Sequence, residues 1–230
     1  MGLKSKQARA VHINKTVQAK SIVIRGTDMN NANLAYLDFS KSEMVDCNFK
    51  FAELTEIKLS QSVLSYSSFN HADMRGADLR RASLQNANMD FANLSGADLS
   101  DADFAHADLT GAVLDQSYTM LNDEVEVKTR LTNASFKKTC LRGAKLTNLD
   151  LSNLNFVGAD LTGANLTGVD LSGSKLIGVN LTGANLTNAN LTETCFKGAV
   201  IRNTKFDGAI LDNIDHAEFA AAVEAGKQVA

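Results

Sequence analysis

Side chains that could do acid–base or nucleophilic chemistry are few in this sequence and are spread along it. Two of the four histidines, His71 and His106, each stand two positions after a large apolar residue but lie seven five-residue steps apart, so they would point from different sides of the protein. The cysteines Cys47, Cys140 and Cys195 form no CxxC pair and have no histidine in register, and no HxxxH, GxSxG or P-loop pattern occurs. We therefore predict a protein that is not an enzyme and that needs no metal and no cofactor.

Acidic residues provide the first candidate for recognition. Between positions 82 and 127 there are nine carboxylates and no Lys or Arg, whereas residues 1–33 and residues 128–211 each carry a net charge of +5. This belt could attract a cationic partner surface by long-range steering, or its aspartates could simply keep the surface soluble. The candidate contact residues are Asp98, Asp101, Asp103, Asp108, Asp115, Asp123, Glu124 and Glu126.

Aromatic residues provide the second candidate. Phe51, His71 and Phe91 recur at intervals of 20 residues, and Tyr66 and Tyr36 fall in neighbouring columns. Exposed aromatic side chains grouped in this way can anchor an interface. They can equally form a stack that stiffens the protein, and the sequence leaves both interpretations open.

All of these residues belong to a repeat of five residues, which must position them. Every fifth residue from Leu34 to Leu114, and again from Leu131 to Leu211, is Leu, Phe, Met or Ile, and a mostly small or aliphatic residue stands two positions before each. A period of five gives no stripe on an α-helix and alternates between the faces of a flat strand. The chain must therefore turn once per repeat and present the same two side chains inward each time. The absence of Pro fits, since each coil must donate backbone hydrogen bonds to its neighbours.

Phrases such as ADLTGANLTG at 159–168 make the chain similar to the pentapeptide repeat family, whose motif is A-(D/N)-L-X-X. The similarity covers residues 22–211. It implies an all-β fold, a right-handed quadrilateral parallel β-helix with four repeats in each 20-residue coil. At that spacing the chain would form a solenoid of about nine coils.

The repeat is interrupted between Leu114 and Leu131, where the two registers differ by two residues. We predict an excursion at 116–129, either a loop or a short β-ribbon, because VEVKT alternates. Glu126 stands where a core Leu would fall if the second register were extended backward. The excursion is either a tolerated insertion at an exposed corner or a recognition loop.

The C-terminal sequence predicts a short capping helix over residues 216–225. Asp215 and Glu218 have the spacing of a capping box, Ile214 and Phe219 that of a hydrophobic staple, and Gly226 suits a helix stop.

The apolar face of this helix has two possible uses. Phe219 and Val223 lie on one side and can cover the last coil, which a solenoid must shield. The same face, with Ile214, could instead pair two subunits end to end, as in the quinolone-resistance members of the family that the chain resembles. At the other end, the N-terminal arm is predicted to form a cap and an irregular first coil with Val11, Ile13, Val17, Ile22 and Ile24.

These signals divide the chain into five segments. They are an N-terminal cap or arm at 1–21, a first lobe at 22–115, the excursion at 116–129, a second lobe at 130–213, and a C-terminal helix and tail at 214–230.

The leading hypothesis is a non-catalytic scaffold that binds a protein partner of unknown identity through its first lobe and excursion. The resemblance implies an alternative, a DNA mimic that protects or inhibits DNA gyrase or topoisomerase IV, of the quinolone- or peptide-toxin-resistance type. A net charge of only −3 and two basic zones favour the scaffold. Direct nucleic-acid binding is not expected without a basic patch interleaved with aromatics. The N-terminal residues lack the apolar core of a secretory signal and no apolar run reaches membrane-spanning length, so we expect a cytoplasmic protein without a membrane partner.

Overall fold

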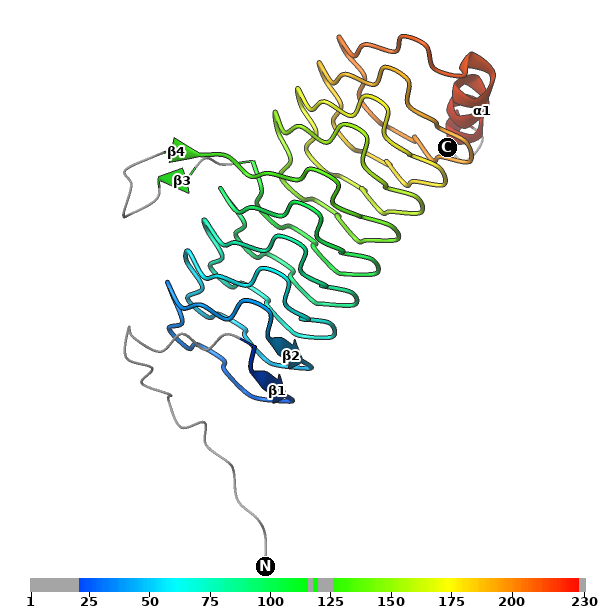
Figure 1. Cartoon of the computed structure of the whole chain (residues 1–230). Helices are drawn as coiled ribbons and strands as arrows, with labels where there is room; N and C mark the ends of the chain where they lie inside the picture. The colour runs from blue at the N-terminus through cyan, green and yellow to red at the C-terminus, as the bar shows by residue number, and fades with distance from the viewer. Residues whose placement is uncertain (1–20, 116–117, 120–125, 228–230) are drawn as a thin grey trace, which may run out of the picture.

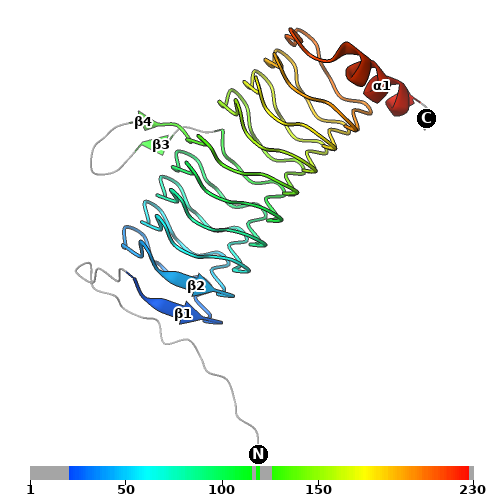
Figure 2. The same ribbon diagram turned by 45° about the vertical axis from the view of Figure 1, so that its right-hand side comes forward.

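The protein is a rod of stacked coils with one helix at its C-terminal end (Figure 1). The computed structural model describes residues 21–115, 118–119 and 126–227. Within these ranges the elements are β1 (Val23–Arg25), β2 (Glu43–Val45), β3 (Tyr118–Thr119), β4 (Glu126–Val127) and α1 (His216–Lys227). A view turned by 45° shows β3 and β4 projecting from the side of the rod, away from the stacked coils (Figure 2).

Each coil contains 20 residues and pairs in parallel with the next. Strand β1 pairs with β2 through Val23 and Glu43, and isolated bridges continue the same 20-residue step along the rod. The residue before each large apolar residue makes the bridge, and its N–H and C=O both bond to the preceding coil. Glu53, for example, donates to the carbonyl of Ala32 and accepts from the N–H of Leu34, both at 2.9 Å. Four such bridges per coil give the coil four sides of five residues.

A tight turn joins each side to the next. The N–H of the inward small residue donates to the carbonyl of the large residue three positions earlier, as Ala72 does to Phe69 at 2.9 Å. The second turn residue adopts the left-handed conformation, with φ of 66° at Tyr36. Asn and Gly recur at this position because they enter that conformation at the lowest cost.

The second letter of the motif stabilises the same turn. A bridge Asp or Asn accepts a hydrogen bond from the backbone N–H two residues later, as Asp103 does from Ala105 at 2.9 Å and Asn165 does from Thr167 at 3.2 Å. Asp and Asn are therefore favoured at this position because they hold the corner, independently of any partner.

The large residues fill the axis of the rod as the five-residue period predicts. Every one from Leu34 to Leu114 and from Leu131 to Ile201 is buried, and the last two, Phe206 and Leu211, are partly buried against the same core. Cys47 replaces an inward Ala and is buried, so burial raises the pKa of its thiol. The cysteine thus acts as a small apolar residue.

Hydroxyl groups at the small inward positions are satisfied by backbone carbonyls. Ser67 donates to Met44 at 2.8 Å, Thr139 to Phe104 at 2.7 Å, and Ser174 to Leu151 at 2.6 Å. A buried hydroxyl without such a bond would cost free energy. The repeat therefore tolerates Ser and Thr where Ala is the common choice.

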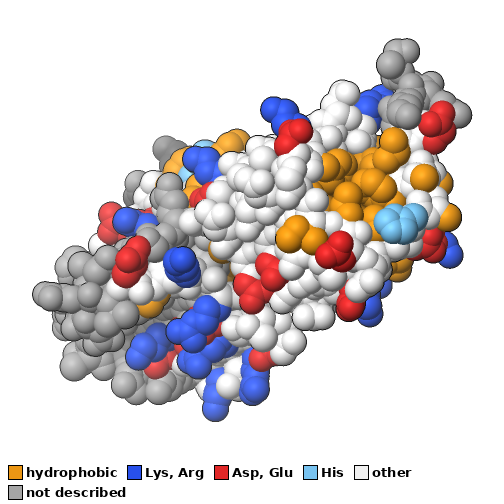
Figure 3. All heavy atoms as spheres, turned by 90° about the horizontal axis from the view of Figure 1, so that it is seen from above, with side chains coloured by type: hydrophobic (Ala, Val, Ile, Leu, Met, Phe, Trp, Pro, Cys, Tyr) orange, Lys and Arg blue, Asp and Glu red, His pale blue; other side chains and the backbone are white. Residues whose placement is uncertain are grey.

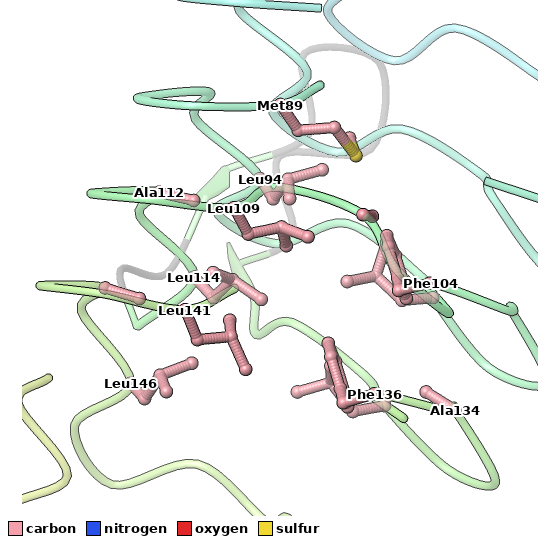
Figure 4. Packing of buried hydrophobic residues seen from close by; sticks show 14 of the residues in the cluster. Met89, Leu94, Phe104, Leu109, Ala112, Leu114, Ala134, Phe136, Leu141 and Leu146 are labelled. Atoms are coloured by element: carbon pink, nitrogen blue, oxygen red, sulfur yellow. The ribbon is translucent and has the colours of Figure 1, made fainter. Parts of the chain in front are cut away.

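The excursion adds twelve residues to one coil without breaking the stack. Bridges across it join residues 32 apart, beginning with Asp98 and Arg130, in place of the usual 20. Phe104 and Phe136 consequently stack at 5.2 Å between ring centroids, and Figure 4 shows the two rings in consecutive layers of the core. Of the two predicted forms, a loop or a short β-ribbon, the structure shows the ribbon, because β3 and β4 pair antiparallel through Tyr118 and Val127.

Helix α1 closes the C-terminal end of the rod. Asp215 caps it, since its carboxylate accepts from the N–H groups of Ala217 and Glu218 at 2.9 and 3.0 Å. Phe219 meets Phe196 and Phe206 edge to face, at 5.2 and 5.6 Å between ring centroids. The predicted helix is confirmed with its start at His216, but it does not stop at Gly226 and ends at Lys227.

The opposite end begins with β1. Ile22 and Ile24 are partly buried against the core, while the rest of the predicted N-terminal cap lies outside the described residues. In the part of the chain that the structure describes, no helix combines the length and the apolar character needed to cross a membrane.

Truncation of one axial residue tests whether the coils support one another. We expect Leu166→Ala to lower the free energy of unfolding by about 2–5 kcal/mol, because Leu166 is fully buried and the walls of the coil cannot collapse into the space. The exposed Ile210→Ala should change it by less than about 0.5 kcal/mol. Urea denaturation measures both, and hydrogen exchange should rise mainly in the coils flanking residue 166. Equal exchange changes along the whole rod would contradict this nearest-neighbour behaviour.

Candidate functional site

Phe51, His71 and Phe91 form a stacked column on one corner of the rod, and we call them the aromatic ridge. The ring centroids lie 5.2 Å apart between Phe51 and His71 and 5.1 Å apart between His71 and Phe91, with interplanar angles of 4° and 8°. The Phe51 and Phe91 residues remain 55% and 53% exposed. The three rings therefore present their edges to solvent as one preformed apolar surface.

The backbone under the aromatic ridge adopts a conformation that such side chains disfavour. Phe51, His71 and Phe91 have φ of 56°, 55° and 54°, in the left-handed region. For residues other than Gly this conformation costs roughly 1–2 kcal/mol. The same corner of the later coils holds Gly111 and then Gly143, so the fold does not require a ring there.

Gly111 is where the aromatic ridge ends. A Cβ atom added to Gly111 would lie 2.5 Å from the ring of Phe91, so the ring packs directly over the glycine backbone. A Cβ atom at Gly143 would meet nothing within 4 Å. Gly111, the next residue of this column after Phe91, thus leaves room for the Phe91 ring and also adopts the left-handed conformation of the turn.

The other predicted aromatic residues lie on different corners. Tyr66 is 64% exposed on the corner before the aromatic ridge, and Tyr36 is 39% exposed on the corner after it. Neither stacks with the ridge. His106, on the same corner as Tyr66, lies apart from His71 as the sequence predicts.

The acidic residues at bridge positions wrap around the rod. Asp98, Asp103 and Asp108 stand on three successive sides. Each accepts a hydrogen bond from the N–H two residues later, at 3.1, 2.9 and 2.9 Å, and so holds its own turn. Their presence is therefore explained by the repeat, and their contact with a partner stays a prediction.

Several acids of the belt also have basic or amide partners. Asp98 pairs with Arg130 at 3.7 Å and Asp101 with Arg81 at 3.6 Å, and Asp103 accepts from the Gln85 amide at 2.7 Å. On the face shown in Figure 3, acidic side chains stand singly or beside basic ones. The belt is therefore a mixed surface and does not form a continuous anionic track.

The remaining predicted acids belong to the excursion and its base. Asp115 accepts from the N–H of Thr147 at 3.3 Å, and Glu126 lies exposed in β4, outside the core position that the extended register would give it. Asp123 and Glu124 lie outside the described residues.

Thr129 anchors the base of the excursion, a role that the sequence analysis missed. Its hydroxyl donates to the carbonyl of Leu114 at 2.5 Å and accepts from the N–H of Gly96 at 3.0 Å. Thr129 occupies the small inward position of the restarted repeat, two residues before Leu131. This spacing from Leu131 could have identified Thr129 from the sequence as an inward residue.

Two arginine–aspartate pairs on the first lobe were also missed. Arg75 holds Asp73 through Nε–Oδ1 and Nη2–Oδ2 contacts of 2.8 and 2.6 Å, and Arg80 holds Asp78 through equivalent contacts of 2.8 Å each. Burial alone would raise the pKa of each carboxyl group, but the arginine hydrogen bonds outweigh it and lower both pKa values. The hydrogen bond and charge of Asp78 raise the pKa of Arg80 in turn.

Open grooves lie beside these pairs. One, which we call the Tyr36 groove, has a volume of about 490 Å³ and is lined by Asn33, Ala35, Tyr36, Leu37, Glu53, Thr55, Asp73 and Arg75. A second runs under the ribbon, between Val127 and the corner glycines Gly76 and Gly96. Neither groove was predicted, because each depends on which columns meet across a corner.

The described residues do not bring together the side chains that a metal site or a reactive thiol would need. Among the described residues, no three His, Cys, Asp or Glu side chains come together in a way that could hold a metal ion. Cys140 contacts the Thr110 hydroxyl at 3.2 Å and Cys195 faces Glu218 of α1 at 3.7 Å, so the two cysteines lie on different sides of the rod.

A regular rod built from five-residue repeats that pair in parallel between coils defines a repeat-built β-helical protein. The profile of the pentapeptide repeat family, with 8 copies, matches residues 23–50, 42–81, 77–116, 129–168, 164–203 and 174–213. The chain therefore belongs to the pentapeptide repeat family, as its repeat predicts. No curated protein matches the sequence at a significant level.

Solved structures of similar proteins include members of the same family. HetL, a pentapeptide repeat protein involved in heterocyst differentiation regulation from the cyanobacterium Nostoc sp. strain PCC 7120, is 28% identical, with 85% of each chain covered and a TM-score of 0.33. QnrB1, a plasmid-mediated fluoroquinolone resistance protein, is 18% identical over 90% of this chain and 96% of that one, with a TM-score of 0.47. Rfr23 from the cyanobacterium Cyanothece 51142 is 21% identical over 83% and 91%, with a TM-score of 0.19.

A matched pair of glycine substitutions tests the aromatic ridge. Gly111 and Gly143 have φ of 64° and 62°, so Ala costs the same backbone strain at both. Gly111→Ala must also displace the Phe91 ring from His71, and should lower the free energy of unfolding by about 1 kcal/mol more than Gly143→Ala. Thermal unfolding measures the difference. In a Phe91→Ala background the two substitutions should become equal, and a persistent difference would contradict the packing of Phe91 on Gly111.

The arginine–aspartate pairs predict an acid-dependent loss of stability. The pKa values of Asp73 and Asp78 are lowered from 3.8 in the folded protein, so their stabilisation is present above pH about 4 and is lost as pH falls through the folded pKa values. The double variant Arg75→Gln/Arg80→Gln lacks this contribution. Its stability deficit relative to the unsubstituted protein should therefore be larger at pH 6 than at pH 2.5 in urea denaturation. A deficit that does not depend on pH would show that the arginines do not act by stabilising the ionised carboxylates.

Proposed function

We propose that this protein is a non-catalytic scaffold that binds a protein partner through the first lobe of its rod. The observation that carries the proposal is the aromatic ridge. The residues Phe51 and Phe91 are more than half exposed. Their backbone adopts the left-handed conformation, which costs free energy for residues other than Gly. Because the later coils place Gly at the same corner, the fold does not require the rings there, and we assign them a role in binding. Clustered, rigidly held aromatic side chains are typical anchors of protein interfaces.

The rod suits this role because its surface is formed before any partner arrives. The backbone at each corner is fixed by hydrogen bonds to the neighbouring coil, such as that from the Phe91 N–H to Thr110 at 2.7 Å. Little conformational entropy is then lost on binding. In this proposal the acidic residues between 82 and 127 steer a basic partner toward the first lobe, and the ribbon extends the contact surface.

The proposal also covers the handedness and number of the coils, the segment boundaries, and the cellular location of the protein. We take the coil as right-handed, with about nine coils, in a cytoplasmic protein divided at the boundaries 1–21, 22–115, 116–129, 130–213 and 214–230. We take α1 as a cap first, because Phe219 already packs on Phe196 and Phe206. In the alternative use, a homodimer, the same apolar face with Ile214, Phe219 and Val223 would pair two subunits end to end.

DNA mimicry toward gyrase or topoisomerase IV is less well supported. A mimic of duplex DNA needs a continuous row of free negative charges at phosphate spacing. Here Asp98 and Asp101 are paired with arginines, and the bridge aspartates wrap around the rod. The surface therefore favours contact with a protein that offers apolar groups.

Partner retention from lysate of the source cells tests the scaffold. The immobilised full-length protein should retain a partner, and Phe51→Ser/Phe91→Ser should reduce its amount at least about tenfold. The control Ile177→Ser/Ile210→Ser removes exposed apolar residues of the second lobe and should leave retention unchanged. Deletion of residues 117–128 should weaken retention if the ribbon takes part.

Two outcomes would overturn the scaffold proposal. One is that the unsubstituted protein retains no partner. The other is that an excess of it restores gyrase supercoiling in the presence of ciprofloxacin, a result that the DNA-mimic alternative predicts and the scaffold does not.

A further inference from the structure

The aromatic ridge and the Tyr36 groove lie next to each other on the first lobe. Phe51 and His71 stand on the corner, and Glu53 and Asp73 follow two residues later on the side that forms the groove. Tyr36 closes the groove at the next corner. A ligand that touches the edges of the ridge rings can therefore reach the groove at the same time.

The charges in this groove are unequal. Asp73 is neutralised by the two-point contact with Arg75, whereas Glu53 accepts a hydrogen bond from the neutral amide of Asn33. Among the described residues, no basic side chain lies within 4.0 Å of the Glu53 carboxylate. Glu53 is therefore an exposed negative charge without an ion pair to any described residue, beside the 39% exposed ring of Tyr36. A carboxylate and an aromatic ring together favour a cationic group.

Glu53 also differs from the residue types, Asp or Asn, that the repeat motif has at its position. It stands at the bridge position, where the motif has Asp or Asn to hold the turn, as Asp73 does by accepting from the Arg75 N–H at 3.2 Å. The side chain of Glu is one methylene longer and reaches toward Asn33 of the preceding coil instead. Turn formation therefore does not explain the choice of Glu at this position.

The spacing of the two features matches an extended chain. Phe51 and Glu53 are two residues apart on either side of a turn, so their Cα atoms lie at most about 7 Å from each other. In an extended partner segment, side chains two residues apart point to the same face and are separated by about 6.5 Å. One apolar side chain can then lie on the ridge while the next side chain on that face enters the groove.

We propose that the aromatic ridge and the Tyr36 groove together bind an extended segment of a partner protein that carries a large apolar side chain and, two residues away, Lys or Arg. The apolar side chain packs against the ring edges of Phe51 and His71. The basic side chain pairs with Glu53 and lies against Tyr36. This inference rests on the proposed scaffold function and specifies the chemistry of its partner.

Selection from a random dodecapeptide library displayed on phage tests the proposal with the full-length protein. Peptides that bind the unsubstituted protein but not Phe51→Ser/Phe91→Ser should share a large apolar residue with Lys or Arg two positions away. Fluorescence polarisation with synthetic copies of the selected peptides should show about fivefold weaker binding to Glu53→Gln, since an exposed ion pair contributes up to about that factor.

A charge exchange makes the test specific. Glu53→Lys should disfavour the basic peptide and bind better to a copy in which Glu replaces its Lys or Arg, while Glu193→Lys, an exposed charge reversal on the second lobe, should leave both affinities unchanged. A thermal unfolding curve unchanged by Glu53→Lys excludes misfolding as the cause. Selected peptides without a basic residue, or equal losses in Glu53→Lys and Glu193→Lys, would overturn the proposal.

The two proposals fail separately. If a cellular partner is retained by the unsubstituted protein and lost with the ridge variant, but Glu53→Lys retains it fully, the scaffold function stands and the basic-segment chemistry is wrong. If no partner is retained at all, the scaffold function itself fails.

Discussion

The structure depends on one constraint: the backbone of each bridge residue must bond, through both its N–H and its C=O, to the coil before it. Glu53 does so with Ala32 and Leu34, and Arg130 still donates to Ala97 on the far side of the excursion. Because four such residues per coil must stay in register, the coil length is fixed at 20 residues wherever the chain repeats. The inward columns and the left-handed corners follow from that length. An insertion is tolerated only if it leaves and re-enters at the same corner.

This constraint explains which features the sequence could predict. The inward residues obey the period by themselves, so the burial of Leu34, Cys47 and Leu191 follows from counting. Helix α1 was predictable because Asp215 acts locally on the first turn of the helix. Contacts that depend on the exact length of the excursion were not. Phe104 meets Phe136 only because twelve residues are inserted, and the two sequence registers do not show how the coils are matched across the gap.

The candidate site was partly predictable for the same reason. The column of Phe51, His71 and Phe91 could be inferred from the 20-residue interval, and the structure confirms its stacking. The Tyr36 groove could not, because it combines residues from two corners and the side between them. Side-chain partners within that groove depend on rotamers, which a period does not determine. The two-point contact between Arg75 and Asp73 is such a case, although the residues are only two apart.

Recognition in a protein of this kind must come from residues that the repeat does not need. Asp98, Asp103 and Asp108 hold their own turns, so any similar rod would carry acids at such positions. A partner that read only those acids could not distinguish one pentapeptide repeat protein from another. Phe91 and Glu53 are different, because the turn geometry favours Gly or Asn at the first position and Asp or Asn at the second. Each departs from what the coil requires, and the two kinds of departure lie side by side on the first lobe. We therefore expect specificity at positions where the residue differs from the type that the turn geometry favours. At the other positions the residue is explained by the fold alone.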